Sequence, residues 1–201
     1  MLAIDDVKNY AYRPTMNKYI ENFENFFAKV FSIIDVGNLS LFQIINNLRS
    51  NGISSCDPNM ISVIIQDKLD ALERARLCPD CNTTGVHNKF VDKKLQTTFG
   101  LIQIKAPYLF CKKCNSFFDP YATILNLKSG KYQYDIQKVA AKIASSIPFA
   151  EAADILKDTH GLHVSQDTLH ELTNELGEQV RLEKIAPEPS TVQEIIAHIA
   201  A

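Results

Sequence analysis

Four of the five cysteines in this 201-residue chain fall in two pairs that have the spacing of metal ligands. The first pair is Cys78 and Cys81 in "CPDC", and the second is Cys111 and Cys114 in "CKKC". Each Cys-x-x-Cys turn presents two thiolates to one metal ion, and two such turns complete the tetrahedral shell of a structural zinc site. We therefore predict one structural zinc ion, bound by Cys78, Cys81, Cys111 and Cys114.

Other interpretations of these cysteines explain less of the pattern. A thioredoxin-like redox site uses one Cys-x-x-Cys motif, and two unrelated reduced turns would make the second pair a coincidence. A catalytic zinc ion needs an open coordination position, which four thiolates do not leave. His87 is an alternative ligand. Cys56 has no partner at metal spacing, so we expect it to be a buried free thiol.

The residues between the two pairs must bring them together. Residues 86–111 are rich in β-branched and aromatic side chains, with alternation at Leu101, Gln103 and Lys105, which indicates strands. We expect turns at residues 92–94 and near Gly100. The segment is thus predicted to be a small antiparallel sheet with a cysteine pair at each end, as in a zinc ribbon.

Helices are predicted before this sheet. Residues 17–36 place one broad apolar face on a helix, and we interpret this face as core packing. Asn38 or Ser40 is expected to cap a second helix over residues 41–49, and Asp57 a third helix that continues to Cys78. The apolar face consists of Tyr19, Phe23, Phe26, Phe27, Val30, Phe31 and Ile34.

After the sheet the pattern is again helical and is typical of a helix-turn-helix. Asp135 is expected to cap one helix, Pro148 to open the next, and Ser165 to cap the last after a break at Gly161. Residues early in the last helix of such a motif reach base edges, here Gln166, Asp167, Thr168 and His170. Residues 147–180, however, hold one Lys against seven acidic residues, so a helical hairpin used only for packing is the alternative.

The predicted fold class is therefore α+β and mostly α. We expect a helical head over residues 1–77, a zinc ribbon over 78–120 and a helix-turn-helix-like domain over 121–185. Residues 186–201 read as a linker and the truncated start of a following domain.

The formal net charge of −2 hides an uneven distribution along the chain. Residues 78–142 hold ten Lys and four Asp, a net charge of +6, whereas residues 143–201 carry −7. Basic side chains supply the phosphate contacts of a DNA-binding protein. We expect such contacts from the ribbon and its C-terminal flank, although a solvated basic face without a partner is the alternative. The lysines concerned are Lys105, Lys112, Lys113, Lys128 and Lys131.

Composition excludes several other classes of protein. The first residues lack a basic start followed by an apolar block, and the chain has no apolar run of about 18 residues. Five cysteines are too few, and odd in number, for a disulfide framework. We expect a cytoplasmic protein without a membrane partner or a small-molecule substrate.

The motifs "CPDC", "APYLFCKKCNSFFDP", "IPFAEAADIL" and "GLHVSQDTL", in this order, resemble the N-terminal half of ISKra-type insertion-sequence transposases. The resemblance covers roughly residues 75–182. It implies a zinc ribbon and a helix-turn-helix that bind transposon ends, followed by an RNase-H-like catalytic domain with metal-binding carboxylates.

The carboxylates of that catalytic domain are missing from the sequence. Residues 191–201 hold a single acid, Glu194, whereas two-metal chemistry needs several carboxylates. The resemblance therefore predicts a DNA-binding, non-catalytic chain that is inactive alone. A homodimer through the apolar face of residues 17–36 is a further partner hypothesis, and a zinc-ribbon protein-interaction module without DNA binding is the alternative function.

Overall fold

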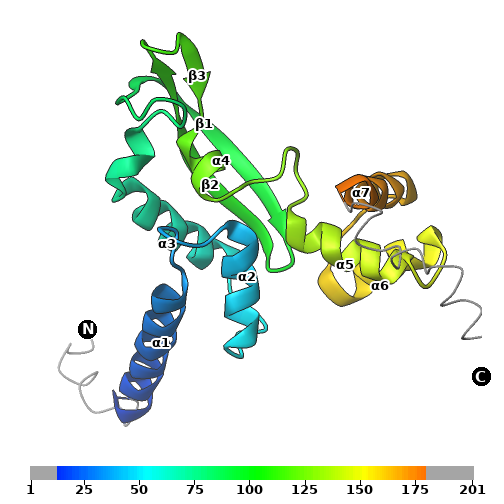
Figure 1. Ribbon diagram of the computed structural model, residues 1–201. Helices are drawn as coiled ribbons and strands as arrows, with labels where there is room; N and C mark the ends of the chain where they lie inside the picture. The colour runs from blue at the N-terminus through cyan, green and yellow to red at the C-terminus, as the bar shows by residue number, and fades with distance from the viewer. Residues whose placement is uncertain (1–12, 180–201) are drawn as a thin grey trace, which may run out of the picture. The chain divides into compact units, whose positions relative to one another are not determined.

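The computed structural model describes residues 13–179 and shows a mostly helical α+β fold, as predicted. This part of the chain contains seven α-helices and one three-stranded antiparallel sheet (Figure 1). The chain divides into two compact units, Met1–Lys131 and Tyr132–Ala201. Among the described helices, none combines the length and the apolar content that a bilayer crossing requires.

The first unit begins with three helices, α1 (Arg13–Ile33), α2 (Leu41–Ser50) and α3 (Pro58–Asp70). Ser40 caps α2 in a capping box with Gln43, and the Asp57 carboxylate accepts a hydrogen bond from the Asn59 amide at the start of α3.

The third helix does not continue to Cys78, which corrects the sequence-based expectation. It ends at Asp70, and a 3₁₀ turn follows over Glu73–Arg76. The chain changes direction there because Ala75 enters the core and the Arg76 carbonyl accepts a hydrogen bond from Gly85.

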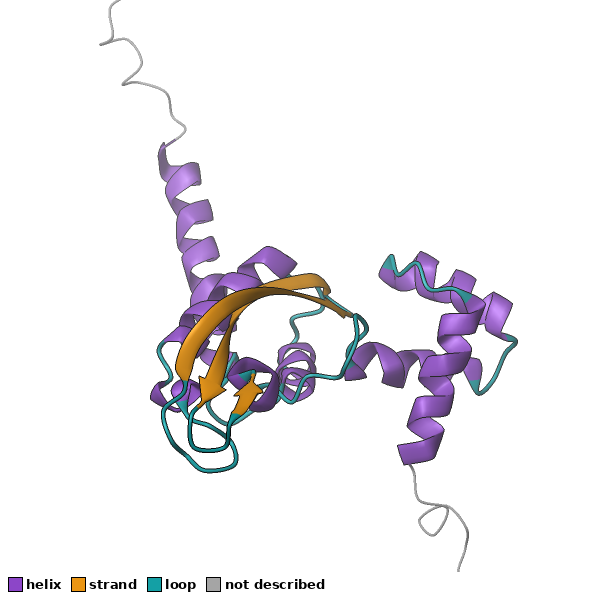
Figure 2. Ribbon diagram, turned by 90° about the horizontal axis from the view of Figure 1, so that it is seen from above, coloured by secondary structure: helices purple, strands orange, loops and turns teal. Residues whose placement is uncertain are grey.

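A long hairpin follows, made of β1 (Val86–Thr97) and β2 (Gly100–Cys111). Its strands curve strongly (Figure 2), and a short strand, β3 (Ser116–Phe118), pairs only with the end of β2. The turn expected at residues 92–94 is wrong, because these residues are paired within the sheet and the chain reverses at residues 98–99. Asp92 pairs with Lys105 across the strands, and Lys93 forms an ion pair with Asp119 at 2.6 Å.

Helix α3 covers the edge of β2 that β3 leaves unpaired. The Ser62 hydroxyl accepts a hydrogen bond from the Gln103 amide at 3.0 Å. The Gln66 side chain accepts from the Lys105 amide at 2.7 Å and donates to the Lys105 carbonyl at 3.2 Å. An open strand edge can pair with a strand of another chain. Ser62 and Gln66 oppose this because they form hydrogen bonds with the backbone groups of that edge.

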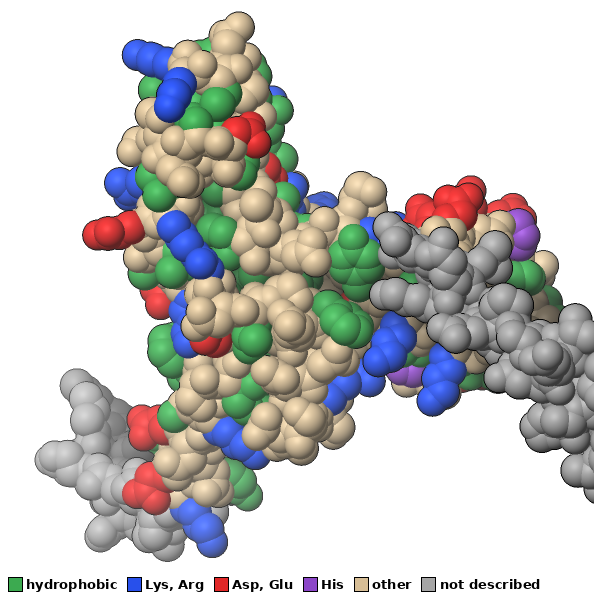
Figure 3. Space-filling view, viewed as in Figure 1, with side chains coloured by type: hydrophobic (Ala, Val, Ile, Leu, Met, Phe, Trp, Pro, Cys, Tyr) green, Lys and Arg blue, Asp and Glu red, His purple; other side chains and the backbone are tan. Residues whose placement is uncertain are grey.

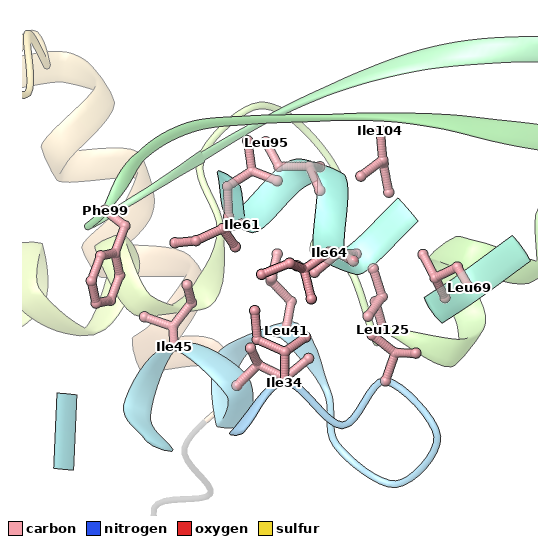
Figure 4. Packing of buried hydrophobic residues seen from close by; sticks show 14 of the residues in the cluster. Ile34, Leu41, Ile45, Ile61, Ile64, Leu69, Leu95, Phe99, Ile104 and Leu125 are labelled. Atoms are coloured by element: carbon pink, nitrogen blue, oxygen red, sulfur yellow. The ribbon is translucent and has the colours of Figure 1, made fainter. Parts of the chain in front are cut away.

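One hydrophobic core joins the predicted head to the hairpin. Leu95 and Ile104 from the hairpin pack over Ile61 and Ile64 of α3, with Ile45 of α2 beneath them (Figure 4). A short helix, α4 (Pro120–Ile124), is capped by Asp119 and is followed by Leu125, which is buried in the same core.

Helix α1 contributes less to this core than its apolar face predicts. Val30 and Ile34 are buried, and Phe27 is partly buried against them. Residues 18–26 are all exposed. The interpretation of the whole face as core packing is therefore wrong for the N-terminal part of α1.

The second unit holds α5 (Tyr134–Ala144), α6 (Phe149–His160) and α7 (Gln166–Gln179), which share a core of their own. Gly161 ends α6 with a φ of 63°, and the Ser165 hydroxyl accepts from the Thr168 amide at 3.2 Å, as expected of the break and the cap. Asp135 does not cap α5: Gln133 holds that position, and Asp135 is buried in the first turn. The predicted linker and final helix over residues 186–201 lie outside the described residues.

Candidate metal centre

The two cysteine pairs lie in two similar tight turns at one end of the hairpin. Residues 77–84 form the first knuckle, closed by an antiparallel bridge between Leu77 and Thr84. Residues 111–116 form the second knuckle, closed by the pairing of Cys111 with Ser116. The hairpin brings the two knuckles together because the first precedes β1 and the second follows β2.

Each knuckle ends with an asparagine in the left-handed region. Asn82 has a φ of 55° and Asn115 a φ of 53°, and each directly follows the second cysteine of its pair. Asparagine tolerates this conformation better than most residues with a side chain. The repeated pattern Cys-x-x-Cys-Asn is therefore a local signal for both turns, which the sequence analysis had not used.

A glycine allows the first knuckle to pack against the strands. A β-carbon on Gly85 would lie 2.6 Å from a ring carbon of Phe118 and 2.9 Å from the β-carbon of Leu109. Phe118 and Leu109 form a small separate cluster with Cys78 and Cys111. Any larger residue at position 85 would push the first knuckle away from the second.

The four sulfur atoms have the separations of a tetrahedral site. All four lie within 4.8 Å of one another, with the Sγ atoms of Cys78 and Cys114 at 3.9 Å and those of Cys81 and Cys111 at 3.5 Å. Ligands at about 2.3 Å from a tetrahedral zinc ion are about 3.8 Å apart. The four cysteines can therefore hold one metal ion.

These distances also argue against the redox alternative. The close contacts at 3.5 and 3.9 Å join cysteines of different knuckles, whereas a thioredoxin-like pair would join the two cysteines of one motif. All of these cysteines are free thiols. A closed shell of four sulfurs leaves no position for a substrate or a reactive water molecule, which is the arrangement of a structural site.

The electrostatics of the cluster favour a cation. Hydrogen bonds from Thr83 and Cys114 lower the pKa of Cys81 to about 6. The thiolate of Cys81 in turn raises the pKa of Cys114 to about 12, with burial adding to the effect. Once Cys81 is ionised, its charge opposes the ionisation of Cys114, and a divalent cation removes that opposition because it favours the charged form of all four thiols.

The other candidate ligands lie outside the cluster. His87 is exposed and its ring packs against Phe90 with the centroids 4.5 Å apart. Cys56 is partly buried far along the chain from the knuckles, and burial and the neighbouring Asp57 raise the pKa of its thiol.

The lysines predicted to contact DNA are distributed along the hairpin and do not form one compact patch. Lys112 and Lys113 are exposed in the second knuckle, and Lys105 is exposed near the middle of β2. Lys131 lies near the opposite end, where its carbonyl accepts from the Gln96 amide at 2.8 Å, and Lys128 is partly buried. Figure 3 shows basic side chains at the end of the first unit that carries β3.

Of the residues predicted to read bases, two take part in contacts inside the second unit. The Thr168 hydroxyl lies 2.9 Å from the Ser165 hydroxyl in the cap of α7. The His170 ring packs edge-on against Phe149 with the centroids 5.4 Å apart. Gln166 is exposed in the first turn of α7.

A groove of about 1100 Å³ is lined by residues of α3, of the hairpin and of the segment between them. Polar groups that line the groove form hydrogen bonds with one another. Gln66 bonds to Lys105 and Asp70, and the Tyr121 hydroxyl donates to Asp70. These polar groups are therefore engaged with one another along the wall of the groove.

No protein-family model matches this chain, and no curated protein matches it. The resemblance to ISKra-type transposases therefore depends only on the motifs quoted from the sequence.

Proposed function

We propose that this chain is the DNA-binding, non-catalytic part of a transposase and that it recognises transposon ends through its zinc ribbon. The order of the cysteine and helix-turn-helix motifs supports the family. The observation that carries the DNA-binding proposal is the placement of Lys112 and Lys113, which are exposed between two cysteines of the metal centre.

Zinc is the metal that best suits this proposal. Four thiolates in a closed shell are the ligand set of structural zinc sites, and residues 13–179 contribute no carboxylate to the cluster. The metal would fix the second knuckle and hold its two lysines in a defined position.

Aromatic side chains beside the second knuckle extend the proposed surface. Phe117 is about half exposed and stacks on Tyr108, with centroids 5.4 Å apart and ring planes at 3°. The Lys89 ammonium lies 5.8 Å from the centre of the Tyr108 ring. Lysines bind phosphates and exposed rings stack on bases, so the combination suits nucleic acid.

The spacing of the basic residues also suits a duplex. The eleven steps from Gly100 to Cys111 span at most about 36 Å, and one turn of B-DNA is about 34–36 Å long. Because the strands curve, the two ends of the hairpin are closer than this length, so lysines at both ends can meet phosphates within one turn of a duplex (Figure 2). The charge of +6 on residues 78–142 falls to about +4 when four thiolates bind Zn²⁺.

Binding of the zinc-loaded chain to duplex DNA at several salt concentrations tests the proposal. Four phosphate contacts predict a log–log salt slope of about −3.6. The double variant Lys112→Glu and Lys113→Glu should weaken binding to every sequence and flatten the slope. Lys18→Glu with Lys157→Glu makes the same charge change outside residues 78–142, at two exposed lysines, and should bind like wild type.

A protein-interaction module is the second candidate function. Residues 147–180 carry a net charge of −6, and Figure 3 shows acidic side chains gathered on one side of the second unit. Such a surface suits a basic protein partner and repels DNA. Wild-type affinity in the Lys112 and Lys113 double variant, or no salt-dependent DNA binding at all, would favour this candidate over the ribbon.

A further inference from the structure

Exposed apolar side chains are concentrated on helix α1. Of the nine large hydrophobic side chains that are exposed in the described part of the chain, five belong to α1. Tyr19 is 69% exposed, Phe23 62% and Ile20 50%, and the others are Phe26 (37%) and Phe31 (39%). We call these five residues the α1 stripe.

The side chains of the stripe are already ordered on the helix. The Phe27 ring stacks between Phe23 and Phe31, with centroids 6.5 and 6.2 Å apart. Lys68 of α3 lies over the Phe31 ring at 4.0 Å, so the C-terminal end of the stripe joins the body of the unit. The N-terminal end has no such cover, because every side chain from residue 18 to residue 26 is exposed.

A helix with this composition needs a partner. Most of the stability of a protein helix comes from packing of its apolar face, and short helices are marginal in water without it. Residues 13–27 extend about 22 Å. Aromatic rings along that length would otherwise face water, which costs about 25 cal/mol per Å² of apolar surface.

Three members of the stripe, together with Val30, have the spacing of a helix–helix seam. Tyr19, Phe23, Phe26 and Val30 follow the alternating intervals of four and three residues that place side chains along one line of a coiled coil. The charged residues of this region, Lys18, Glu21, Glu24 and Lys29, fall at none of these four positions. Val30 is buried in the core, so the seam begins in the unit and continues outward along α1.

The area of the stripe matches a small dimer. If a fully exposed aromatic side chain presents about 200 Å², the stripe offers about 500 Å² per chain. Two copies would bury on the order of 1,000 Å², which is the lower limit for a specific protein–protein interface. A two-fold contact requires a surface that is complementary to itself. The seam meets this requirement because both partners present the same uncharged side chains.

From these observations we infer that α1 is a homodimer interface, in which the α1 stripe of one chain packs against that of a second copy. The contact is independent of DNA binding, because the stripe shares no residue with the ribbon. Its small area makes the dimer a reversible one that depends on concentration.

Sedimentation velocity of the zinc-loaded full chain, over about a hundredfold range of concentration, tests the inference. The wild type should shift from the 22.6 kDa of one chain toward twice that mass. Phe23→Glu places a charge in the middle of the seam of each partner and should weaken the dimer at least about a hundredfold. Val63→Glu is the matched control, because Val63 is 64% exposed on α3, outside the stripe, and this variant should dimerise like wild type.

Phe23 is exposed in the single chain, so Phe23→Glu should keep its zinc content, and its circular dichroism should match that of wild type at low concentration, where both are monomeric. A wild type that stays monomeric at every concentration would overturn the inference and would indicate that residues 1–12 or another protein covers the stripe. A dimer that persists in Phe23→Glu, or that Val63→Glu disrupts equally, would also overturn it.

Discussion

Replacement of Cys111 by Ser should unfold the cysteine end of the ribbon and leave the main core folded. The two regions differ in how many apolar side chains they bury. Around the metal centre the buried cluster consists of Cys78, Leu109, Cys111 and Phe118. The main core of the first unit contains 20 buried residues, and none of the four clustered cysteines belongs to it.

The expected loss follows from the size of the knuckles. Ordering the 14 residues of segments 77–84 and 111–116 costs roughly 20 kcal/mol of backbone entropy. Burial of Leu109 and Phe118 contributes about 5 kcal/mol, and a structural zinc ion about 10–16 kcal/mol. A zinc ion at the four cysteines would thus supply most of the stabilisation of both knuckles.

Metal analysis and hydrogen exchange measure the two halves of this prediction. Wild type should hold about one zinc ion per chain, and Cys111→Ser should hold none and lose amide protection over residues 77–84 and 109–116. Protection over residues 95–106 should remain, because that part of the hairpin lies in the main core and α3 covers its edge. Cys56→Ser should resemble wild type in both measurements. Full zinc content in Cys111→Ser, or loss of protection along the whole hairpin, would refute the reasoning.

Further substitutions test the supporting parts of the fold and the proposed function. Gly85→Ala should lower zinc affinity in competition with a chelator, whereas Gly177→Ala, which has open space around it, should not. Tyr121→Phe should cost about 1.5–3 kcal/mol by removing the hydrogen bond to the Asp70 carboxylate. Burial raises the pKa of Tyr121 above its ordinary 10.0, so wild-type stability should fall above about pH 10, where the unfolded phenol ionises. Denaturant titrations at pH 8 and pH 11 should show a larger fall in wild type than in Tyr121→Phe. Gln166→Ala should change sequence preference without a uniform loss of DNA affinity, and equal losses on all sequences would contradict base contact by α7. The purified chain should not cleave DNA with Mg²⁺ or Mn²⁺, and metal-dependent nicking would contradict its non-catalytic assignment.

Features that depend on a few neighbouring residues were predicted well. The four cysteines meet because ligand spacing and the strand pattern between the pairs both restrict the geometry. The Ser40 cap, the Asp57 cap and the Gly161 break depend on bonds within about four residues, so sequence alone identifies them.

Features that depend on distant parts of the chain were predicted less well. The polar run at residues 92–94 suggested a turn, but these residues are compatible with a strand because Asp92 meets Lys105 and Lys93 meets Asp119. The 3₁₀ turn after Asp70 ends at Arg76, whose carbonyl accepts a hydrogen bond from Gly85. Neither partner can be identified from the local sequence.

Neither net charge nor helical periodicity shows how side chains are arranged in the folded chain, as α1 and the lysines illustrate. A helical apolar face shows which side chains lie together, but it does not show what covers them: Val30 and Ile34 enter the core of the same chain, whereas Phe23 on the same face remains exposed. A net charge of +6 likewise shows how many lysines the segment holds, but the hairpin separates Lys112 from Lys131 by nearly its whole length. The fold was needed to show that the exposed apolar side chains form a continuous stripe and that the lysines are distributed along the hairpin. For this reason we propose that the stripe binds one partner of matching shape, a second copy of the chain. For the lysines we propose an extended partner with regularly spaced charges, duplex DNA.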